Sequence, residues 1–333
     1  MNNNRGDKFQ PVLHENVLSL IGNTPLVRLQ TVCGPGPHTI LAKLEYLNPS
    51  GSVKDRMSLY IIEDAEQQGL LAPGDLIIDN SSGNTAVSVA MVGAIKGYRT
   101  MFTVPDKTSR EKIDLIKSLG AEVVICPHEV PHDHPDSYYS TARRLAKELG
   151  AFLINQYHNK KNIEAHYRTT GPEIWQQTGG NIDVFVAGIG TGGTFSGVAR
   201  YLKEKNPQIM NIAVDPVGSI FYDQIKHGVA VPPQAYKVEG IGTDVLTGAM
   251  DFSVVDEIIQ VDDKQAFQAA RELTRREGLL AGGSSGSVVS AINQILPTFK
   301  SPKKIVTILP DSGMRYVSKF LRDSWMEEYG FLD

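Results

Sequence analysis

One lysine stands where a neutral amine is favoured. Residues 48–52 (Asn-Pro-Ser-Gly-Ser) are typical of a turn, and Lys54 follows them at the expected start of a helix that stops at Gly69. The positive end of the helix dipole disfavours an ammonium group there. A neutral amine is the form that reacts with an aldehyde to give a Schiff base. The stretch therefore predicts carbonyl chemistry at Lys54, whereas an average lysine is only a solvated surface residue.

A second stretch is suited to binding an anion. Residues 188–194 read Gly-Ile-Gly-Thr-Gly-Gly-Thr between an expected strand and an expected helix. Small residues let backbone N–H groups approach an anion, and the helix N-terminus adds its field. Gly188, Gly190 and Gly193 also satisfy Gly-x-Gly-x-x-Gly, and Asp215 ends the next strand near the spacing of a ribose-binding acid. A dinucleotide, another phosphate ligand and a tight structural turn all remain open for this loop alone.

Two further polar turns precede expected helices. Residues 79–85 (Asp-Asn-Ser-Ser-Gly-Asn-Thr) offer hydroxyls, amides and backbone donors that suit a carboxylate. An ordinary helix cap uses the same residue types, so this turn has two interpretations. Residues 281–287 (Ala-Gly-Gly-Ser-Ser-Gly-Ser) suit a second anion loop or a close approach to a flat ligand.

The composition narrows the class of protein. The 333 residues are 41% apolar, which is enough for the core of one large domain or two. A net charge of −4 leaves no basic field for nucleic acid or an anionic membrane, and no run is apolar enough to span a bilayer. Two cysteines without a Cys-x-x-Cys motif and a polar N-terminus favour a cytoplasmic protein.

A metal site is not expected. Cys33 and His38 are too few to close a coordination shell. His128, His132 and His134 lie in a segment rich in Pro and Asp but lack the spacing of a zinc site. That segment is predicted to be an exposed loop.

Expected strands and helices alternate along most of the chain. Alternation of this kind predicts an α/β protein with a parallel sheet and helices on both of its faces. The expected strands are 26–29, 40–45, 75–79, 100–104, 122–126, 152–154, 184–187, 211–214 and 305–309. The expected helices are 54–66, 86–96, 109–119, 138–149, 163–177, 194–205, 265–277 and 287–296.

Four motifs in one order make the chain similar to a known family. They are residues 51–56 (Gly-Ser-Val-Lys-Asp-Arg), 81–85, 190–194 and 282–284. With them the chain resembles the fold-type-II enzymes that use pyridoxal 5′-phosphate (PLP), and among these the cystathionine β-synthase and cysteine synthase family. The resemblance runs from about His14 to the C-terminus. It implies an α/β fold with two parallel-sheet domains, like that of the tryptophan synthase β subunit.

The resemblance also implies an organisation for the whole chain. Residues 46–151 would form a smaller mobile domain, residues 14–45 and 152–333 the larger PLP-binding domain, and residues 1–13 a flexible tail. The strand pair before residue 46 would pack with the larger domain. We expect a homodimer, with no haem-binding extension before the core and no regulatory module after it.

The resemblance also implies a role for individual residues, according to their positions in the motifs. Lys54 would hold PLP through a Schiff base and then remove the substrate Cα proton, as the catalytic residue. Asn84 would hydrogen-bond the 3′-oxygen of the ring, and Ser284 would face the pyridine nitrogen. The phosphate would be bound by Gly190, Thr191, Gly192, Gly193 and Thr194. The substrates would be bound by Ser81, Ser82, Asn84, Thr85, Gln156, Tyr157 and Gly242.

The reaction that the resemblance implies is a PLP-dependent β-replacement. L-Serine would condense with L-homocysteine to give cystathionine and water, a lyase-type step of transsulfuration and cysteine biosynthesis. A serine hydroxyl at the pyridine nitrogen would not keep the ring protonated, which favours elimination over transamination. The alternative is a cysteine synthase that uses O-acetylserine and sulfide.

Some residues distinguish these two activities. Residues 238–242, 309–312 and 319–326 look like cystathionine β-synthase, whereas residues 169–175 look like cysteine synthase. Ser81, Ala86 and Thr243 depart from the family pattern, where threonine, glycine and, in animal cystathionine β-synthases, tyrosine are usual. The last two departures leave the second substrate open.

Two other classes of protein compete with this interpretation. A nicotinamide-dependent dehydrogenase would use the 188–193 loop but leaves the Lys54 and Ser284 loops unexplained. A non-catalytic protein that binds an amino acid through the 81–85 turn leaves Lys54 unexplained.

Overall fold

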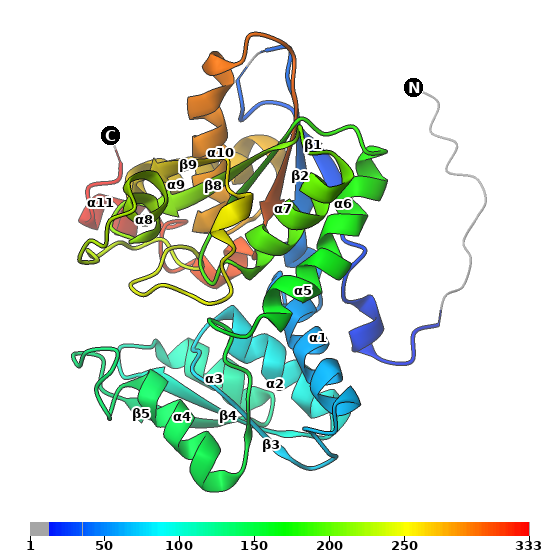
Figure 1. Ribbon diagram of the computed structural model, residues 1–333. Helices are drawn as coiled ribbons and strands as arrows, with labels where there is room; N and C mark the ends of the chain where they lie inside the picture. The colour runs from blue at the N-terminus through cyan, green and yellow to red at the C-terminus, as the bar shows by residue number, and fades with distance from the viewer. Residues whose placement is uncertain (1–12, 35, 333) are drawn as a thin grey trace.

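The structure is a computed structural model that describes residues 13–34 and 36–332. The predicted tail, residues 1–13, therefore lies outside the described residues except for Leu13, which is exposed. Within the described ranges the strands form two separate sheets, one above the other in Figure 1.

The larger sheet has the strand order β1-β2-β10-β7-β8-β9 in the described chain. β1 pairs antiparallel with β2, and every other neighbouring pair in this sheet is parallel. The first two strands thus join the larger sheet, as the resemblance implied. Its strands are β1 (Leu26–Leu29), β2 (Thr39–Leu44), β7 (Val184–Gly188), β8 (Met210–Pro216), β9 (Glu257–Val261) and β10 (Lys304–Leu309).

The smaller sheet has the order β5-β4-β3-β6 and is parallel throughout its described strands. The predicted α/β fold with two parallel sheets is therefore confirmed, with the single antiparallel strand β1 at one edge. The strands are β3 (Leu76–Asp79), β4 (Arg99–Pro105), β5 (Glu122–Cys126) and β6 (Phe152–Leu153). The domain boundaries at residues 46 and 151 stay a prediction.

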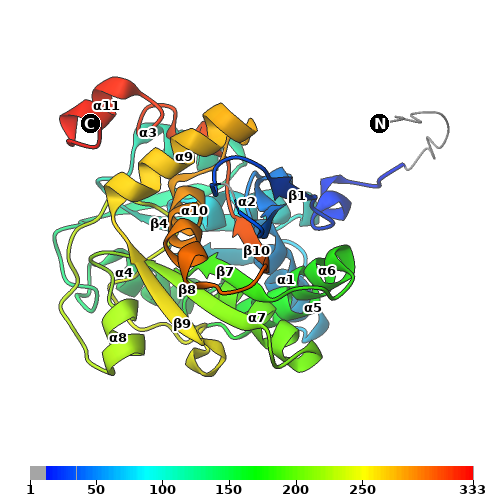
Figure 2. The same cartoon turned by 90° about the horizontal axis from the view of Figure 1, so that it is seen from above.

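Helices cover both sheets (Figures 1 and 2). The α1–α4 helices lie with the smaller sheet, and α6, α7, α9 and α10 lie with the larger one. The helices are α1 (Lys54–Gln67), α2 (Asn84–Lys96), α3 (Arg110–Ser118), α4 (Tyr138–Leu149), α5 (Lys161–Arg168), α6 (Thr170–Thr178), α7 (Gly193–Lys205), α8 (Phe221–His227), α9 (Asp263–Glu277), α10 (Gly283–Ile295) and α11 (Asp323–Glu328).

The larger sheet is apolar on both faces. Val184 and Val186 of β7 belong to one buried cluster, which includes residues of α9 and α10. Phe185 and Ala187 belong to another, which includes residues of α6 and α7. Side chains alternate across a strand, so a parallel sheet covered by helices on both faces has apolar residues at most of its positions.

Several elements differ from the predicted pattern, and α8, β9 and α11 have no counterpart in it. The predicted helix 163–177 is two helices that meet at Thr169, because Pro172 in the first turn of α6 has no N–H to continue α5 and would clash with the preceding turn. β9 is a partly buried edge strand that carries Glu257 and Gln260 among its five residues, so it lacks the apolar run of the inner strands. α10 begins at Gly283, four residues earlier than predicted, so its glycines and serines form the first turn.

Among the described residues no helix is long and apolar enough to cross a membrane. The same part of the chain contains no group of three or more histidine, cysteine or acidic residues placed to hold a metal ion.

Candidate active site

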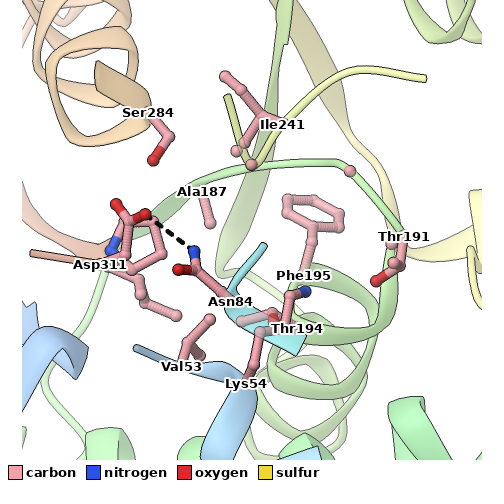
Figure 3. A pocket seen from close by; sticks show the side chains of 16 residues that line it. Val53, Lys54, Asn84, Ala187, Thr191, Thr194, Phe195, Ile241, Ser284 and Asp311 are labelled. Carbon is pink, nitrogen blue, oxygen red and sulfur yellow. Dashed lines mark hydrogen bonds between the residues drawn. The ribbon is translucent and has the colours of Figure 1, made fainter. Parts of the chain in front are cut away.

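A cavity lies between the two sheets. Its narrow part has a volume of about 40 Å³, and it continues into a wider cleft of about 630 Å³. Its walls come from the segments that follow β3, β7 and β10, since the carboxyl ends of these strands face the same space. Figure 3 shows that Lys54, Asn84, Ser284 and Asp311 surround it.

Lys54 is the first residue of α1, as predicted. The loop before it is bound to the end of β10, because Val53 N–H donates to the Pro310 carbonyl (2.8 Å) and Ser312 N–H donates to the Gly51 carbonyl (3.2 Å). The side chain is half-buried, with its end at the cavity. Burial lowers the pKa of Lys54 to about 8, against the opposing charges of Asp311 and Asp79. At pH 7 the neutral fraction of the amine is therefore far larger than that of an ordinary lysine, whose pKa is 10.5.

The first turn of α1 is anchored by buried ion pairs. Arg56 Nε donates to Glu45 (2.7 Å) and Arg56 Nη1 to Glu173 (2.7 Å). Burial acts to raise the pKa of Glu45, but the Arg56 charge overcomes this effect and the pKa falls to about 2. Asp55 accepts hydrogen bonds from Ser50 N–H (2.7 Å) and Ser88 Oγ (2.7 Å). These contacts fix the direction in which Lys54 leaves the helix.

The glycine-rich loop runs from the end of β7 into α7. A Cβ at Gly190 would lie 2.7 Å from the Gly240 carbonyl oxygen, and one at Gly192 would lie 2.7 Å from Met250 Cα. Gly192 also has φ +92°, which disfavours residues with a side chain. The loop therefore depends on these glycines, and its backbone N–H groups at the N-terminus of α7 suit a phosphate.

The hydroxyls of this loop are held by two residues that the sequence did not reveal. Thr194 Oγ1 lies 3.1 Å from His166 Nε2, and Asn162 Nδ2 donates to Thr191 Oγ1 (3.1 Å). Burial lowers the pKa of His166 to about 3, with the charge of Arg56 acting in the same direction. The imidazole is therefore neutral and positions the Thr194 hydroxyl without adding charge. A histidine and an asparagine inside a helix carry no spacing signal that would have pointed to this loop.

The 79–85 turn joins β3 to α2 and lines the wider cleft. Thr85 Oγ1 donates to Gln156 Oε1 (2.7 Å), and Gln156 Nε2 donates to Asp79 Oδ2 (3.2 Å). Burial raises the pKa of Asp79 to about 7, although hydrogen bonds from Gln156 and its neighbours act against this rise. Ser81, Ser82, Tyr157 and Gly242 line the same cleft. All predicted substrate residues are thus brought together.

Ser284 lies in the first turn of α10 and points into the cavity (Figure 3). Its side chain is 1% exposed, and its Oγ has no hydrogen-bond partner among the described residues. A buried hydroxyl normally has a partner, and because this unpartnered Oγ also points into the cavity, it is placed to meet a polar ligand atom. With the Lys54 amine and the glycine loop, the residues present fit PLP, which carries an aldehyde, a phosphate and a ring nitrogen.

Two departures from the family pattern lie away from the cavity surface. Thr243 is 5% exposed, and its hydroxyl donates to the Val245 carbonyl (2.8 Å) instead of facing the cleft. Ala86 is fully buried in the core of the smaller sheet. Asp215, the candidate ribose-binding acid, is also fully buried and accepts the N–H of Tyr222 (2.9 Å). A ribose could not reach it.

The fold and this site define an enzyme that uses pyridoxal phosphate. The chain belongs to the family of pyridoxal-phosphate dependent enzymes, whose sequence model matches residues 17–311. PLP is therefore its cofactor. The dehydrogenase alternative loses its support, because the glycine pattern at residues 188–193 lies in the segment that this family's sequence model matches.

Its relatives include enzymes of both predicted activities. The chain is 44% identical over 329 residues to cystathionine β-synthase of Oryctolagus cuniculus, covering 97% of this chain and 59% of that protein. It is 42% identical to cystathionine β-synthase of Saccharomyces cerevisiae, covering 96% of this chain and 65% of that protein. It is 40% identical over 305 residues to cysteine synthase of Staphylococcus aureus, covering 91% of this chain and 96% of that protein. The chain thus spans less than two thirds of the cystathionine β-synthases, but nearly all of the cysteine synthase.

A solved structure agrees with the fold. The crystal structure of O-ureido-L-serine synthase superposes with a TM-score of 0.86 at 34% identity, covering 95% of this chain and all of that one. The chain is therefore a PLP-dependent enzyme of the cystathionine β-synthase and cysteine synthase family.

Proposed function

We propose that this protein catalyses a PLP-dependent β-replacement in which L-serine and L-homocysteine give cystathionine and water. The observation that carries this proposal is the wide cleft of about 630 Å³ that opens directly onto Lys54. A second amino acid needs such a space, whereas sulfide needs almost none. The identity to cystathionine β-synthases over nearly all of this chain supports the same choice.

The residues around the cavity would bind PLP in one orientation. Residues 190–194 would hold its phosphate, Asn84 its 3′-oxygen, and Ser284 its ring nitrogen. When bound, PLP supplies an aldehyde for amines and a conjugated ring that stabilises negative charge at the substrate Cα. Ser284 is a neutral partner and does not hold the ring nitrogen protonated. This environment favours loss of the β-substituent over transamination.

Lys54 would act as the base. Its pKa of about 8 lies close to neutral pH, so the amine can accept the Cα proton and return a proton to the departing hydroxyl, which leaves as water. The substrate carboxylate would bind at the turn that carries Ser81 and Ser82, where backbone donors and the N-terminus of α2 converge. Thr85 and Gln156 would complete this carboxylate site.

We further propose that residues 46–151 close over the bound substrate. Lys112 of α3 forms an ion pair of 2.5 Å with Glu239, which also contacts Lys319. Glu239 therefore connects α3, which packs with the smaller sheet, to a segment of the larger one across the cleft mouth. Closure would exclude water before the thiol adds. The protein is proposed to work as a cytoplasmic homodimer, which sedimentation equilibrium of the purified protein tests.

A cysteine synthase activity is the second candidate. Residues 169–175 resemble that enzyme, and the Staphylococcus aureus cysteine synthase is 40% identical. Sulfide could use the same cavity without filling the wider cleft. We therefore expect some activity with O-acetylserine and sulfide beside the main one.

The test compares both substrate pairs on one preparation. We expect kcat/KM for serine with homocysteine to exceed that for O-acetylserine with sulfide, and cystathionine to appear as product by mass spectrometry. Lys54→Ala is the control and should abolish both reactions. A strong preference for O-acetylserine with sulfide and no detectable cystathionine would assign the protein to the cysteine synthases.

A further inference from the structure

Asp311 is a buried carboxylate that none of the roles above uses. It follows β10, is 1% exposed, and lies against the cavity beside Asn84 (Figure 3). Its Oδ2 accepts two hydrogen bonds, from Tyr316 Oη (2.6 Å) and from Asn84 Nδ2 (2.8 Å). Its Oδ1 has no partner in the described part of the chain.

The carboxylate has little freedom to move. A Cβ at Gly282 would lie 2.0 Å from Asp311 Oδ1, so the backbone of the Ser284 loop closes one side. The Gly282 N–H donates to the Asp311 carbonyl (3.0 Å), and Asp311 forms an antiparallel bridge with Ser52 of the Lys54 loop. Backbone contacts to the Ser284 loop and to the Lys54 loop thus fix the main chain of Asp311. The hydroxyl of Tyr316, a residue that is 5% exposed, fixes its side chain.

This arrangement determines which end of the Asn84 amide faces Asp311. An amide has an accepting oxygen and a donating nitrogen, and only the nitrogen can lie 2.8 Å from a carboxylate oxygen without repulsion. The amino group has a second N–H, which remains for a ligand in the cavity. A donated hydrogen bond stabilises the ionised form of a hydroxyl, whereas an accepted one stabilises the protonated form.

We propose that Asp311, held by Tyr316, is a positioning residue that orients the Asn84 amide so that Asn84 donates to the 3′-oxygen of PLP. The inference rests on the role proposed above for Asn84, and it goes beyond that role by assigning what controls its direction. Asp311 acts through Asn84 and needs no contact of its own with the reacting atoms.

The test uses the resting holoenzyme without substrate. PLP with an ionised ring hydroxyl absorbs in the visible, and the un-ionised form absorbs in the near ultraviolet. Asp311→Ala removes the acceptor, so we expect part of the visible band to be replaced by the near-ultraviolet band. We also expect the affinity of the apoprotein for PLP to fall about tenfold. Asp311→Asn keeps an acceptor oxygen and should restore most of the visible band.

A double-mutant cycle separates positioning from a direct effect of the charge. In an Asn84→Ala background, Asp311→Ala should cause no further change in the spectrum, because the proposed route through the Asn84 amide is already gone. A matched control is Asp215→Ala, which removes another fully buried carboxylate with one unpartnered oxygen but lies outside the residues that line the cavity. It should leave the spectrum unchanged.

Three results would overturn the proposal: no spectral change in Asp311→Ala, the same change in the Asn84→Ala background, or no restoration by Asp311→Asn. If Asp311→Ala does not fold, Tyr316→Phe replaces it in the cycle. Tyr316→Phe should shift the absorption spectrum in the same direction but by less. In the Asn84→Ala background it should cause no shift. These spectra need no second substrate. A protein that fails to make cystathionine but shows the predicted cycle would refute the proposed reaction and keep this inference.

Discussion

The backbone N–H of Val53 donates a hydrogen bond of 2.8 Å to the carbonyl of Pro310. This contact joins the loop of Lys54 to the end of β10 in the larger sheet. The rest of α1 packs elsewhere, since Met57 and Ile61 belong to the buried cluster of the smaller sheet. Lys54 therefore stands at the junction of the two sheets, and a movement of the smaller sheet need not carry it away from Ser284 or the glycine loop.

The lowered pKa of Lys54 predicts the pH dependence of cofactor capture. The amine is charged below its pKa of about 8 and neutral above it. We expect the rate at which apoprotein captures PLP to rise with pH and to level off above about pH 8. With an ordinary lysine, whose pKa is 10.5, the rate would continue to rise up to about pH 10.5. Borohydride should then fix the cofactor to Lys54, which peptide mapping by mass spectrometry identifies.

Lys43 is the matched control for that labelling. Its side chain is fully buried, but its Nζ is paired with Glu173 (2.8 Å), and the residue does not line the cavity. Lys54→Ala should keep the fold and lose the label. Label found on Lys43, or a capture rate that still rises at pH 10, would contradict the assignment.

Ser284 should set the protonation of the cofactor ring. Ser284→Ala should weaken PLP binding by about 1 kcal/mol, the value of one neutral hydrogen bond, as measured by titration of apoprotein. Ser284→Asp should stabilise a protonated ring and alter the absorption spectrum recorded with serine. Ser285→Ala is the control, because Ser285 Oγ is likewise buried without a partner among the described residues but does not line the cavity. Equal effects of both alanine variants would disprove the assignment.

The glycine-rich loop should not tolerate a side chain at Gly192. Gly192→Ala would place a Cβ 2.7 Å from Met250 Cα and force a residue with a side chain to φ +92°. We expect the circular dichroism spectrum to be retained and PLP affinity to fall by about tenfold or more, given a strain of about 1–2 kcal/mol plus the backbone clash. Gly228→Ala has a similar positive φ of +68° but open space around it, and should bind PLP normally. Unchanged affinity in Gly192→Ala would show that the phosphate lies elsewhere.

The buried pair of Glu45 and Arg56 predicts how stability depends on pH. The folded pKa of Glu45 is about 2 against an ordinary 4.5, so its contribution is fully present above pH 4.5 and is lost as the pH falls towards 2. Glu45→Gln should lower the free energy of unfolding by about 3 kcal/mol at pH 7, measured by denaturant titration. The difference between the two proteins should shrink below pH 4.5. A difference that stays constant down to pH 3 would mean that the charge of Glu45 contributes nothing.

The contacts in the site that join distant segments were beyond the reach of the sequence, and the missed residues show why. Asp311 looks like a turn residue after a strand, and nothing in the sequence brings it to Asn84. His166 reads as one polar residue of an amphipathic helix, yet it meets Thr194 of the loop. The first contact depends on how the end of β10 lies against the start of α2, and the second on how α5 packs on α7.

The sequence by itself determined the motifs and the alternation of strands and helices. Lys54 at a helix start and the glycines at 190–193 depend on turn geometry and helix termini, which act over a few residues and leave their mark in residue types. Only the tertiary structure decided that Thr243 turns away from the cleft and which aspartate meets Asn84. The physical reason is that a side chain's surroundings come from packing between segments distant in sequence, which local patterns do not encode.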